Sequence, residues 1–282
     1  MKIRINNRTS YSYSKPVFLE PHFLRLRPRE DPAQHVLEFS LDISPEPGGL
    51  GYGLDPDSNW LTSIWFDKQT EVLEVAVKTV VETLRSNPFD FVLTSPEFSM
   101  RSSLYTDDLR QRLGHVLTPI GGGAASELAH SVGTKEGLMA YLTGLNSLIK
   151  ESFQVVYREF GNPLTPAETI EAGAGACRDL AVLFIDACRT VGIAARFASG
   201  YLAASDVPEE HTLHAWAEVY LPGAGWRGFD PTLGLMVADA HVCLAVSSLY
   251  VGAAPLTGTF RGTGASSKMT TLIEVERLDG KI

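Results

Sequence analysis

The sequence has little cysteine and no surplus of positive charge. Its 282 residues include three cysteines, Cys177, Cys188 and Cys243, and no Cys-x-x-Cys pair. Such a sparse, odd set argues against a disulfide framework and against a thiolate zinc site, so we expect no metal and no other cofactor. The 24 Lys and Arg residues are outnumbered by 33 Asp and Glu, which gives a formal net charge of −9. No basic field is available to hold phosphate groups, so nucleic acid is not an expected partner.

Long apolar runs are absent as well. No window approaches the roughly 20 apolar residues of a bilayer-spanning helix. The first residues, Met1-Lys-Ile-Arg-Ile-Asn6, lack the apolar stretch of a secretory signal. We therefore expect a soluble, cytoplasmic protein without a membrane partner. A hydrophobic content of 44% is nevertheless enough for a substantial core, and the length favours two domains.

Alternation of apolar and polar residues predicts β structure in about the first 85 residues. Residues 37–43 place four apolar side chains on one face, and residues 72–79 form a second alternating run. Between them, residues 45–59 are rich in Pro, Gly and Asp, which is typical of a turn or long loop. We expect these runs to form a small antiparallel β-sandwich.

The pattern changes near Ser86-Asn-Pro88, where helical spacing of apolar residues begins. We predict a domain boundary here, with an N-terminal β-sandwich domain at residues 1–88 and a catalytic core at residues 89–282. Helical spacing occurs at residues 106–117 and 135–152, and strand-like runs follow at residues 192–201, 214–221, 226–229, 242–246 and 269–277. This order predicts an α+β fold rather than a doubly wound βαβ sheet.

Residues 177–191 predict an amphipathic helix that begins at a cysteine. Apolar residues recur at helical spacing from Leu180 to Val191, and Gly192 is a typical residue at a helix C-terminus. Cys188 lies within the apolar part of this helix, where a free cysteine is expected to be a small core residue.

Cys177 is expected in the first turn of that helix, because Gly173 and Gly175 allow the preceding chain to turn tightly. The unpaired N–H groups and the positive end of the helix dipole favour an anion there. They lower the pKa of a thiol and provide donors for an oxyanion, the backbone N–H of Cys177 among them. Cys177 is therefore the candidate nucleophile. The alternative is a small buried residue at a helix start.

A candidate base lies in the run His214-Ala-Trp-Ala-Glu-Val-Tyr-Leu221. With strand alternation, Ala and Val side chains form one face, and His214, Trp216, Glu218 and Tyr220 point to the other. His214 is thereby directed toward a surface or cleft, although a single histidine on a strand can also be merely solvated.

Asp230 is the candidate partner of this histidine. Pro222-Gly-Ala-Gly225 predicts a turn between two antiparallel strands. A connection from Leu221 to Gly225 pairs Tyr220 with Trp226, which places Asp230 on the His214 face. The alternative for Asp230 is an Asp-Pro turn residue. A cysteine at a helix start, a histidine and an aspartate form the nucleophile, base and orienting group of acyl transfer.

Three motifs in this order resemble the bacterial form of the transglutaminase-like superfamily. They are Gly175-Ala-Cys177-Arg-Asp179, His214-Ala-Trp-Ala-Glu218 and Gly225-Trp-Arg-Gly-Phe-Asp230-Pro-Thr232. The resemblance implies an N-terminal β domain ahead of a papain-like core. It also implies Cys177 as thiolate nucleophile, His214 as general base and acid, and Asp230 as the orienting carboxylate. Bacterial relatives often read Gly-Arg-Asp-Tyr where this chain has Ser247-Ser-Leu-Tyr250.

The expected function is attack on a peptide or glutamine-type amide through a thioester, with a peptide or protein as substrate. Water as acceptor makes the protein a cysteine peptidase or amidase, which we favour. An amine acceptor makes it a transglutaminase or amide ligase. A catalytically silent binding or scaffold module is the alternative from another class. A zinc hydrolase that uses Cys177, His214 and Asp230 as ligands is a third reading that the cysteine pattern disfavours.

Three neighbouring side chains have two possible roles. Trp216 and Trp226 either line a substrate groove or cover the hairpin. Asp179 either complements the helix dipole in the first turn or supports the site as a partner of nearby groups. Oligomeric state and the second oxyanion donor have no signal in the sequence.

Overall fold

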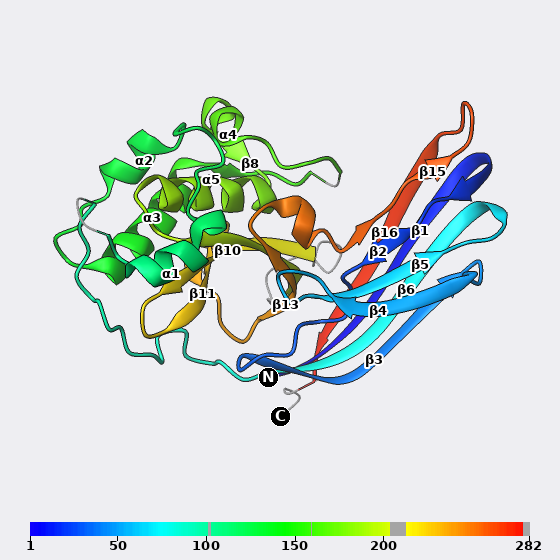
Figure 1. Cartoon of the computed structure of the whole chain (residues 1–282), viewed down its shortest axis with the longest axis horizontal. Coiled ribbons are helices and arrows are strands. Elements are labelled where there is room, and N and C mark those ends of the chain that lie inside the picture. The colour runs from blue at the N-terminus through cyan, green and yellow to red at the C-terminus, as the bar shows by residue number, and fades with distance from the viewer. Residues whose placement is uncertain (101–102, 159, 204–212, 279–282) are drawn as a thin grey trace.

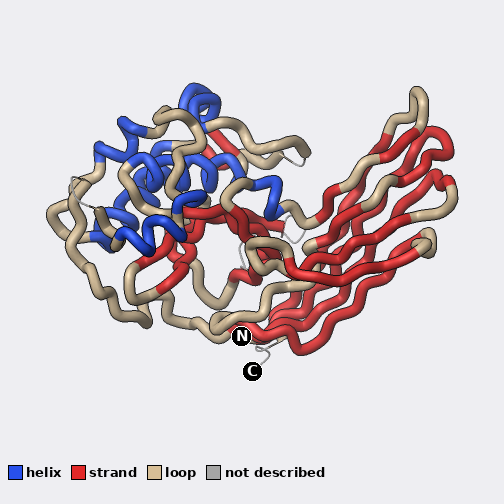
Figure 2. Tube along the Cα trace, in the orientation of Figure 1, coloured by secondary structure: helices blue, strands red, loops and turns tan. Residues whose placement is uncertain are grey.

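The computed structural model describes residues 1–282 except 101–102, 159, 204–212 and 279–282. A helix-covered sheet forms one part of the molecule, and an elongated all-β region extends from it (Figure 1). Figure 2 shows the helices gathered in the first part. The sheets are antiparallel apart from one two-stranded parallel pair. The predicted α+β fold with an N-terminal β region is confirmed.

The N-terminal region contains two antiparallel sheets that share one core. Alternation in residues 37–43 and 72–79 forms parts of β3 and β6, as predicted. Ile3 and Ile5 of β1 and Ile64 of β5 are fully buried in this core. The strands are β1 (Lys2–Leu19), β2 (His22–Leu24), β3 (Gln34–Ser44), β4 (Gly49–Leu54), β5 (Trp60–Trp65) and β6 (Gln69–Thr83).

The C-terminal chain returns to these sheets. β16 (Ser267–Arg277) pairs with β1 from Ile3↔Arg277 to Tyr13↔Ser267. β15 (Phe260–Arg261) also pairs with β1, and β14 (Leu256–Thr257) pairs with β2. The predicted boundary at 88/89 places these strands in the core, whereas they complete the N-terminal sheets. Alternation indicates a strand but does not identify its partner, because pairing depends on edges that only the folded chain presents.

The core part is built on a five-stranded sheet with the order β12-β11-β10-β9-β13. Its strands are β9 (Ala195–Leu202), β10 (Leu213–Leu221), β11 (Gly225–Asp230), β12 (Leu235–Met236) and β13 (His241–Ser247). The other elements are α1 (Asp107–Arg112), η1 (Gly114–Val116), α2 (Ser126–Ser131), α3 (Leu138–Ser152), β7 (Gln154–Val155), α4 (Pro166–Ala172), β8 (Ala174–Gly175), α5 (Cys177–Thr190) and η3 (Tyr250–Ala253). Among the described residues, no helix is long and apolar enough to cross a membrane.

Helix α5 is buried against one face of this sheet. Its apolar stripe packs on the aliphatic face of β10, and Phe184 stacks on Phe229 of β11 with ring centroids 5.6 Å apart. Gly192, just beyond the helix, has a φ of 77°, which is the left-handed conformation that glycine adopts most readily. The predicted helix over residues 177–191 is therefore confirmed to within one residue.

The N-terminal region packs on this sheet at the end of β9 and along β13. Tyr201, Val242 and Leu244 belong to the same buried cluster as the first strand. The Asn7 side-chain amide donates a 2.8 Å hydrogen bond to the Tyr201 hydroxyl. The central sheet thus contacts helix α5 on one face and the N-terminal β region at its β13 side.

Candidate functional site

Cys177 is the first residue of α5, and Ala176 before it is extended with φ −73° and ψ 168°. The Cys177 residue is half-buried, whereas Cys188 and Cys243 are buried. A cysteine at a helix N-terminus lies where an anion is favoured. The structure therefore places Cys177 where the sequence predicts it.

Asp179 anchors the chain that precedes this cysteine. Its fully buried carboxylate accepts hydrogen bonds from the backbone N–H groups of Ala176 and Leu164, each at 2.8 Å. It also forms an ion pair with Arg158 at 2.5 Å. Both readings for Asp179 apply, because it is the acidic residue in the first turn of α5 and also a partner of groups around the site.

His214 and Asp230 are joined directly. Strands β10 and β11 pair Tyr220 with Trp226, which is the predicted register. The His214 Nε2 and the Asp230 Oδ2 lie 2.7 Å apart. Because an ionised carboxylate can only accept, the His214 Nε2–H is the donor.

The other nitrogen of His214 is left for Cys177. The side chains of Cys177 and His214 line the same cavity, and the charge of His214 acts on the Cys177 thiol. Burial raises the pKa of the Cys177 thiol, but the hydrogen bond and charge of His214 and the Ala215 N–H outweigh it and lower that pKa below its ordinary value. Burial lowers the pKa of His214, yet the charge and hydrogen bond of Asp230 and the contact with Cys177 raise it to about 10. Both shifts favour a thiolate and imidazolium pair.

The Asp230 carboxylate is fully buried and ionised. Burial raises its pKa, but the charge and hydrogen bond of His214 and the contacts with His241 hold that pKa well below the usual range. Its Oδ1 accepts the backbone N–H groups of Thr232 at 2.9 Å and Leu233 at 3.3 Å. The residues after Asp230 therefore form a turn that holds the carboxylate.

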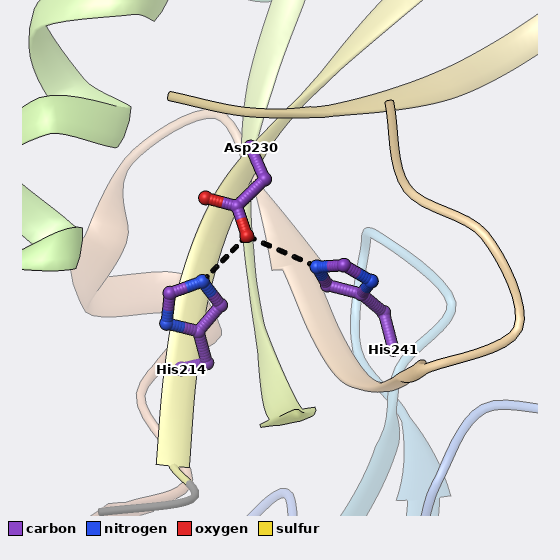
Figure 3. A group of neighbouring side chains, drawn as sticks. All are labelled: His214, Asp230 and His241. Carbon is purple, nitrogen blue, oxygen red and sulfur yellow. Dashed lines mark hydrogen bonds and ion pairs between the residues drawn. The ribbon is translucent and has the colours of Figure 1, made fainter. Parts of the chain in front are cut away.

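His241 also contacts this carboxylate, and the sequence did not predict it. Its Nε2 lies 3.0 Å from the Asp230 Oδ2, so that the carboxylate stands between two imidazole rings (Figure 3). His241 opens β13, which joins the sheet beside β9 rather than beside the strand of Asp230. The only sequence signal is a histidine at the start of an apolar run, and its partner is set by the strand order.

His214, Asp230 and His241 also have the donor types of a divalent-cation site. One ligand atom from each lies within 4.8 Å of the others. Zinc ligands at about 2.0–2.2 Å from a tetrahedral ion stand about 3.3 Å or more apart. The observed separations of 2.7 and 3.0 Å are those of direct hydrogen bonds, so an ion would have to spread the group. Of the three ligands in the zinc-hydrolase reading, Cys177 is not in this group.

A cavity of about 380 Å³ opens beside Cys177 and His214. Its lining is largely apolar, with side chains from β9, the start of β10 and the segment 250–257. Apart from Cys177 and His214, Arg178 is its one charged lining residue among those described. The Ser199 hydroxyl in its wall already donates to the Ala253 carbonyl at 2.5 Å. The cavity therefore suits an apolar group next to the thiol.

Neither tryptophan of the two motifs lines this cavity. Trp216 is 1% exposed and lies in a buried cluster with Cys243. Trp226 packs edge-on against Tyr220, and the Arg196 guanidinium lies 4.0 Å from its ring centroid. Of the two readings for these side chains, the structural one applies.

Each of the two parts of the fold is similar to a known protein family. Residues 3–82 match the bacterial transglutaminase-like N-terminal region, and residues 126–231 match the core of the transglutaminase-like superfamily. The chain belongs to the transglutaminase-like superfamily, in its bacterial type with a β region ahead of the core.

Relatives of similar length span the whole chain. An uncharacterised protein of Mycobacterium leprae is 24% identical over 283 residues, covering 98% of this chain and 99% of the relative. One of Mycobacterium tuberculosis strain H37Rv is 26% identical over 298 residues, covering 99% and 94%. A solved structure of a proposed cysteine protease from Cytophaga hutchinsonii superimposes with a TM-score of 0.74 and 21% identity, over 100% of this chain and 92% of that one. At this level of identity, the similarity shows a shared fold and no more.

Proposed function

We propose that the protein is a cysteine-nucleophile enzyme that cleaves peptide or glutamine-type amide bonds through a thioester, with Cys177, His214 and Asp230 as its catalytic residues. One observation carries the proposal: Cys177 and His214 line the same cavity, and Asp230 holds the His214 ring with a hydrogen bond of 2.7 Å. Superfamily membership supports the same reaction class.

In the acylation step, the Cys177 thiolate attacks the amide carbon and the carbonyl oxygen gains the negative charge. Backbone N–H groups at the start of α5, which lack carbonyl partners within the helix, point at this oxyanion. The His214 imidazolium then donates its proton to the leaving nitrogen, and the amine departs. A thioester to Cys177 and a neutral imidazole remain.

In the second step, His214 removes a proton from the acceptor as it attacks the thioester carbon. That proton restores the imidazolium, and collapse of the oxyanion then breaks the C–S bond and expels the Cys177 thiolate. Water yields a carboxylic acid, and a primary amine yields a new amide. We favour water, because the half-buried Cys177 is reached by solvent.

The test is incubation with a mixed peptide library, with and without a primary amine, followed by mass spectrometry. The proposal expects new carboxylic acids from cleaved peptides or deamidated glutamines in both samples, and none with Cys177→Ala. Amine-linked products that replace the acids would identify a transferase. No product from a folded protein would favour a silent binding module.

The cellular setting is part of the same proposal. All three cysteines are free thiols, which suits the reducing cytoplasm. The expectation of no nucleic-acid partner, which rests on the net charge of −9, stays a prediction.

A further inference from the structure

Two histidines donate to one carboxylate oxygen. The Asp230 Oδ2 accepts from His214 Nε2 at 2.7 Å and from His241 Nε2 at 3.0 Å (Figure 3). Their ring centroids are 6.1 Å apart. The proposed reaction uses only His214, so the second donor needs its own explanation.

The two rings differ in what lies at their other nitrogen. His214 lines the same cavity as Cys177, so its remaining nitrogen is the one available to the thiol. The Nδ1 of His241 is buried and has no hydrogen-bond partner among the described residues. A hydrogen on that atom would be a buried donor without an acceptor, which is unfavourable. His241 is therefore expected to carry its hydrogen on Nε2, directed at Asp230.

Four hydrogen bonds then surround the Asp230 carboxylate. Oδ2 accepts from the two imidazoles, and Oδ1 accepts from the N–H groups of Thr232 and Leu233. With both oxygens held, the carboxylate plane cannot rotate without losing bonds in a fully buried site. Its orientation in turn sets the direction of the His214 ring.

We propose that His241 is a positioning residue of this site: its Nε2–H fixes the Asp230 carboxylate and thereby aims His214 at Cys177. The purpose of this contact rests on the proposed function. The hydrogen bonds themselves belong to the site without substrate. His241 is 5% exposed and does not line the cavity, so it is not placed to touch a substrate there.

The N-terminal region holds His241 in place. β13 is an edge strand of the central sheet, and two residues after His241 the Cys243 backbone pairs with the Gln34 side chain. The Arg29 N–H also donates to the Cys243 carbonyl at 3.0 Å. In the sheet itself, the rings of His241 and Trp216 pack edge to face at a centroid distance of 5.2 Å. The role of the β region thus includes fixing the strand that carries this donor.

The test measures the second-order rate constant for alkylation of Cys177 by iodoacetamide in the full-length protein at a pH of about 6. This rate reports the thiolate and needs no substrate. His241→Leu removes the donor but keeps an apolar side chain of moderate size, and His241→Gln restores an N–H donor. We expect the leucine variant to react about 10- to 100-fold more slowly than wild type, and the glutamine variant to recover most of the rate.

Two results would overturn the proposal. A folded His241→Leu variant that reacts at the wild-type rate shows that the donor is unnecessary. If Cys177 alkylation is slowed equally in the leucine and glutamine variants, and their thermal stability is equal, His241 has a packing role only.

A measurement on the wild-type protein covers the case in which the leucine variant does not fold. Long-range 15N–1H spectra of the imidazoles are expected to show the His241 hydrogen on Nε2, and a hydrogen on Nδ1 alone contradicts the inference. Failure of the peptide-library assay combined with His241-dependent alkylation would overturn the proposed function and leave the positioning role standing.

Discussion

The side-chain amide of Gln34 pairs with both backbone groups of Cys243, as a neighbouring strand would. Its Oε1 accepts the Cys243 N–H and its Nε2 donates to the Cys243 carbonyl, each at 2.8 Å. Asn59 does the same for Val246, at 2.9 and 2.7 Å. Two amides thereby satisfy the free edge of β13, which would otherwise be buried without partners.

Replacing Gln34 by leucine is therefore expected to destabilise the protein by about 1–3 kcal/mol, because the Cys243 N–H would remain buried without an acceptor. Urea denaturation measures the change. Gln69→Leu, at an exposed position of β6, is the matched control, and its expected effect is within about 0.5 kcal/mol. Equal stability of the two variants would show that the amide is not needed at this edge.

The pH dependence of Cys177 alkylation follows from the pKa shifts. The lowered pKa of the Cys177 thiol keeps the thiolate present below the ordinary thiol range, and it is lost as the pH falls through that lowered value. The imidazolium of His214 persists until the pH rises through about 10. At pH 6 an ordinary thiol of pKa about 8.5 is only about 0.3% ionised. Wild type should therefore react much faster at pH 6 than a free thiol does.

In His214→Ala, burial is no longer opposed by the imidazolium, and the midpoint of the alkylation profile should move above the ordinary thiol pKa. Peptide mapping provides the internal control. Cys188 and Cys243 are buried and should stay unlabelled in the folded protein. An unchanged profile in His214→Ala would disprove the thiolate and imidazolium pair.

Loss of the Asp179 carboxylate should loosen the wall of the cavity. Asp179→Ala leaves the N–H groups of Ala176 and Leu164 and the charge of Arg158 without their acceptor. We expect a loss of about 2–4 kcal/mol in unfolding free energy. Asp108→Ala is the control, because its ion pair with Arg112 is exposed on both sides and should contribute less than about 1 kcal/mol. Similar losses in both variants would argue against an anchoring role.

The apolar cavity predicts a preference for apolar acyl donors. A peptidyl chloromethyl ketone with leucine beside its reactive group should label Cys177 faster than one with aspartate. Val251→Asp, at a residue that lines the cavity and is 56% exposed, should reduce the rate of the leucine probe by about tenfold. Leu272→Asp, at a 60% exposed position of β16, should leave it unchanged. Equal rates for the two probes in wild type would contradict the predicted preference.

Gly200 is required by the close approach of three strands. A Cβ there would lie 2.0 Å from the Val242 carbonyl oxygen and 2.8 Å from the Trp216 ring. Because backbone cannot shift cheaply, Gly200→Ala should cost about 1–3 kcal/mol or more. Gly53→Ala has no atom within 4 Å of the new Cβ and should be nearly neutral. Thermal unfolding of both variants measures the difference, and a stable Gly200→Ala protein would show that the sheet adapts.

The sequence by itself determined the elements that carry Cys177, His214 and Asp230. Helical periodicity marks α5, and the three-residue turn after Leu221 sets the register that brings His214 and Asp230 together. Both are local properties, since periodicity and turn length act within a few residues. The order of the three motifs indicated the transglutaminase-like superfamily.

Only the tertiary structure decided what surrounds these residues. β16 joins β1 across most of the chain length, Gln34 satisfies the Cys243 backbone, and His241 reaches Asp230 from a strand on the far side of β9. Each contact depends on which sheet edges and buried polar groups remain open after the local elements have formed. The packing of the whole chain determines which edges and polar groups these are, so no short stretch of sequence can predict them.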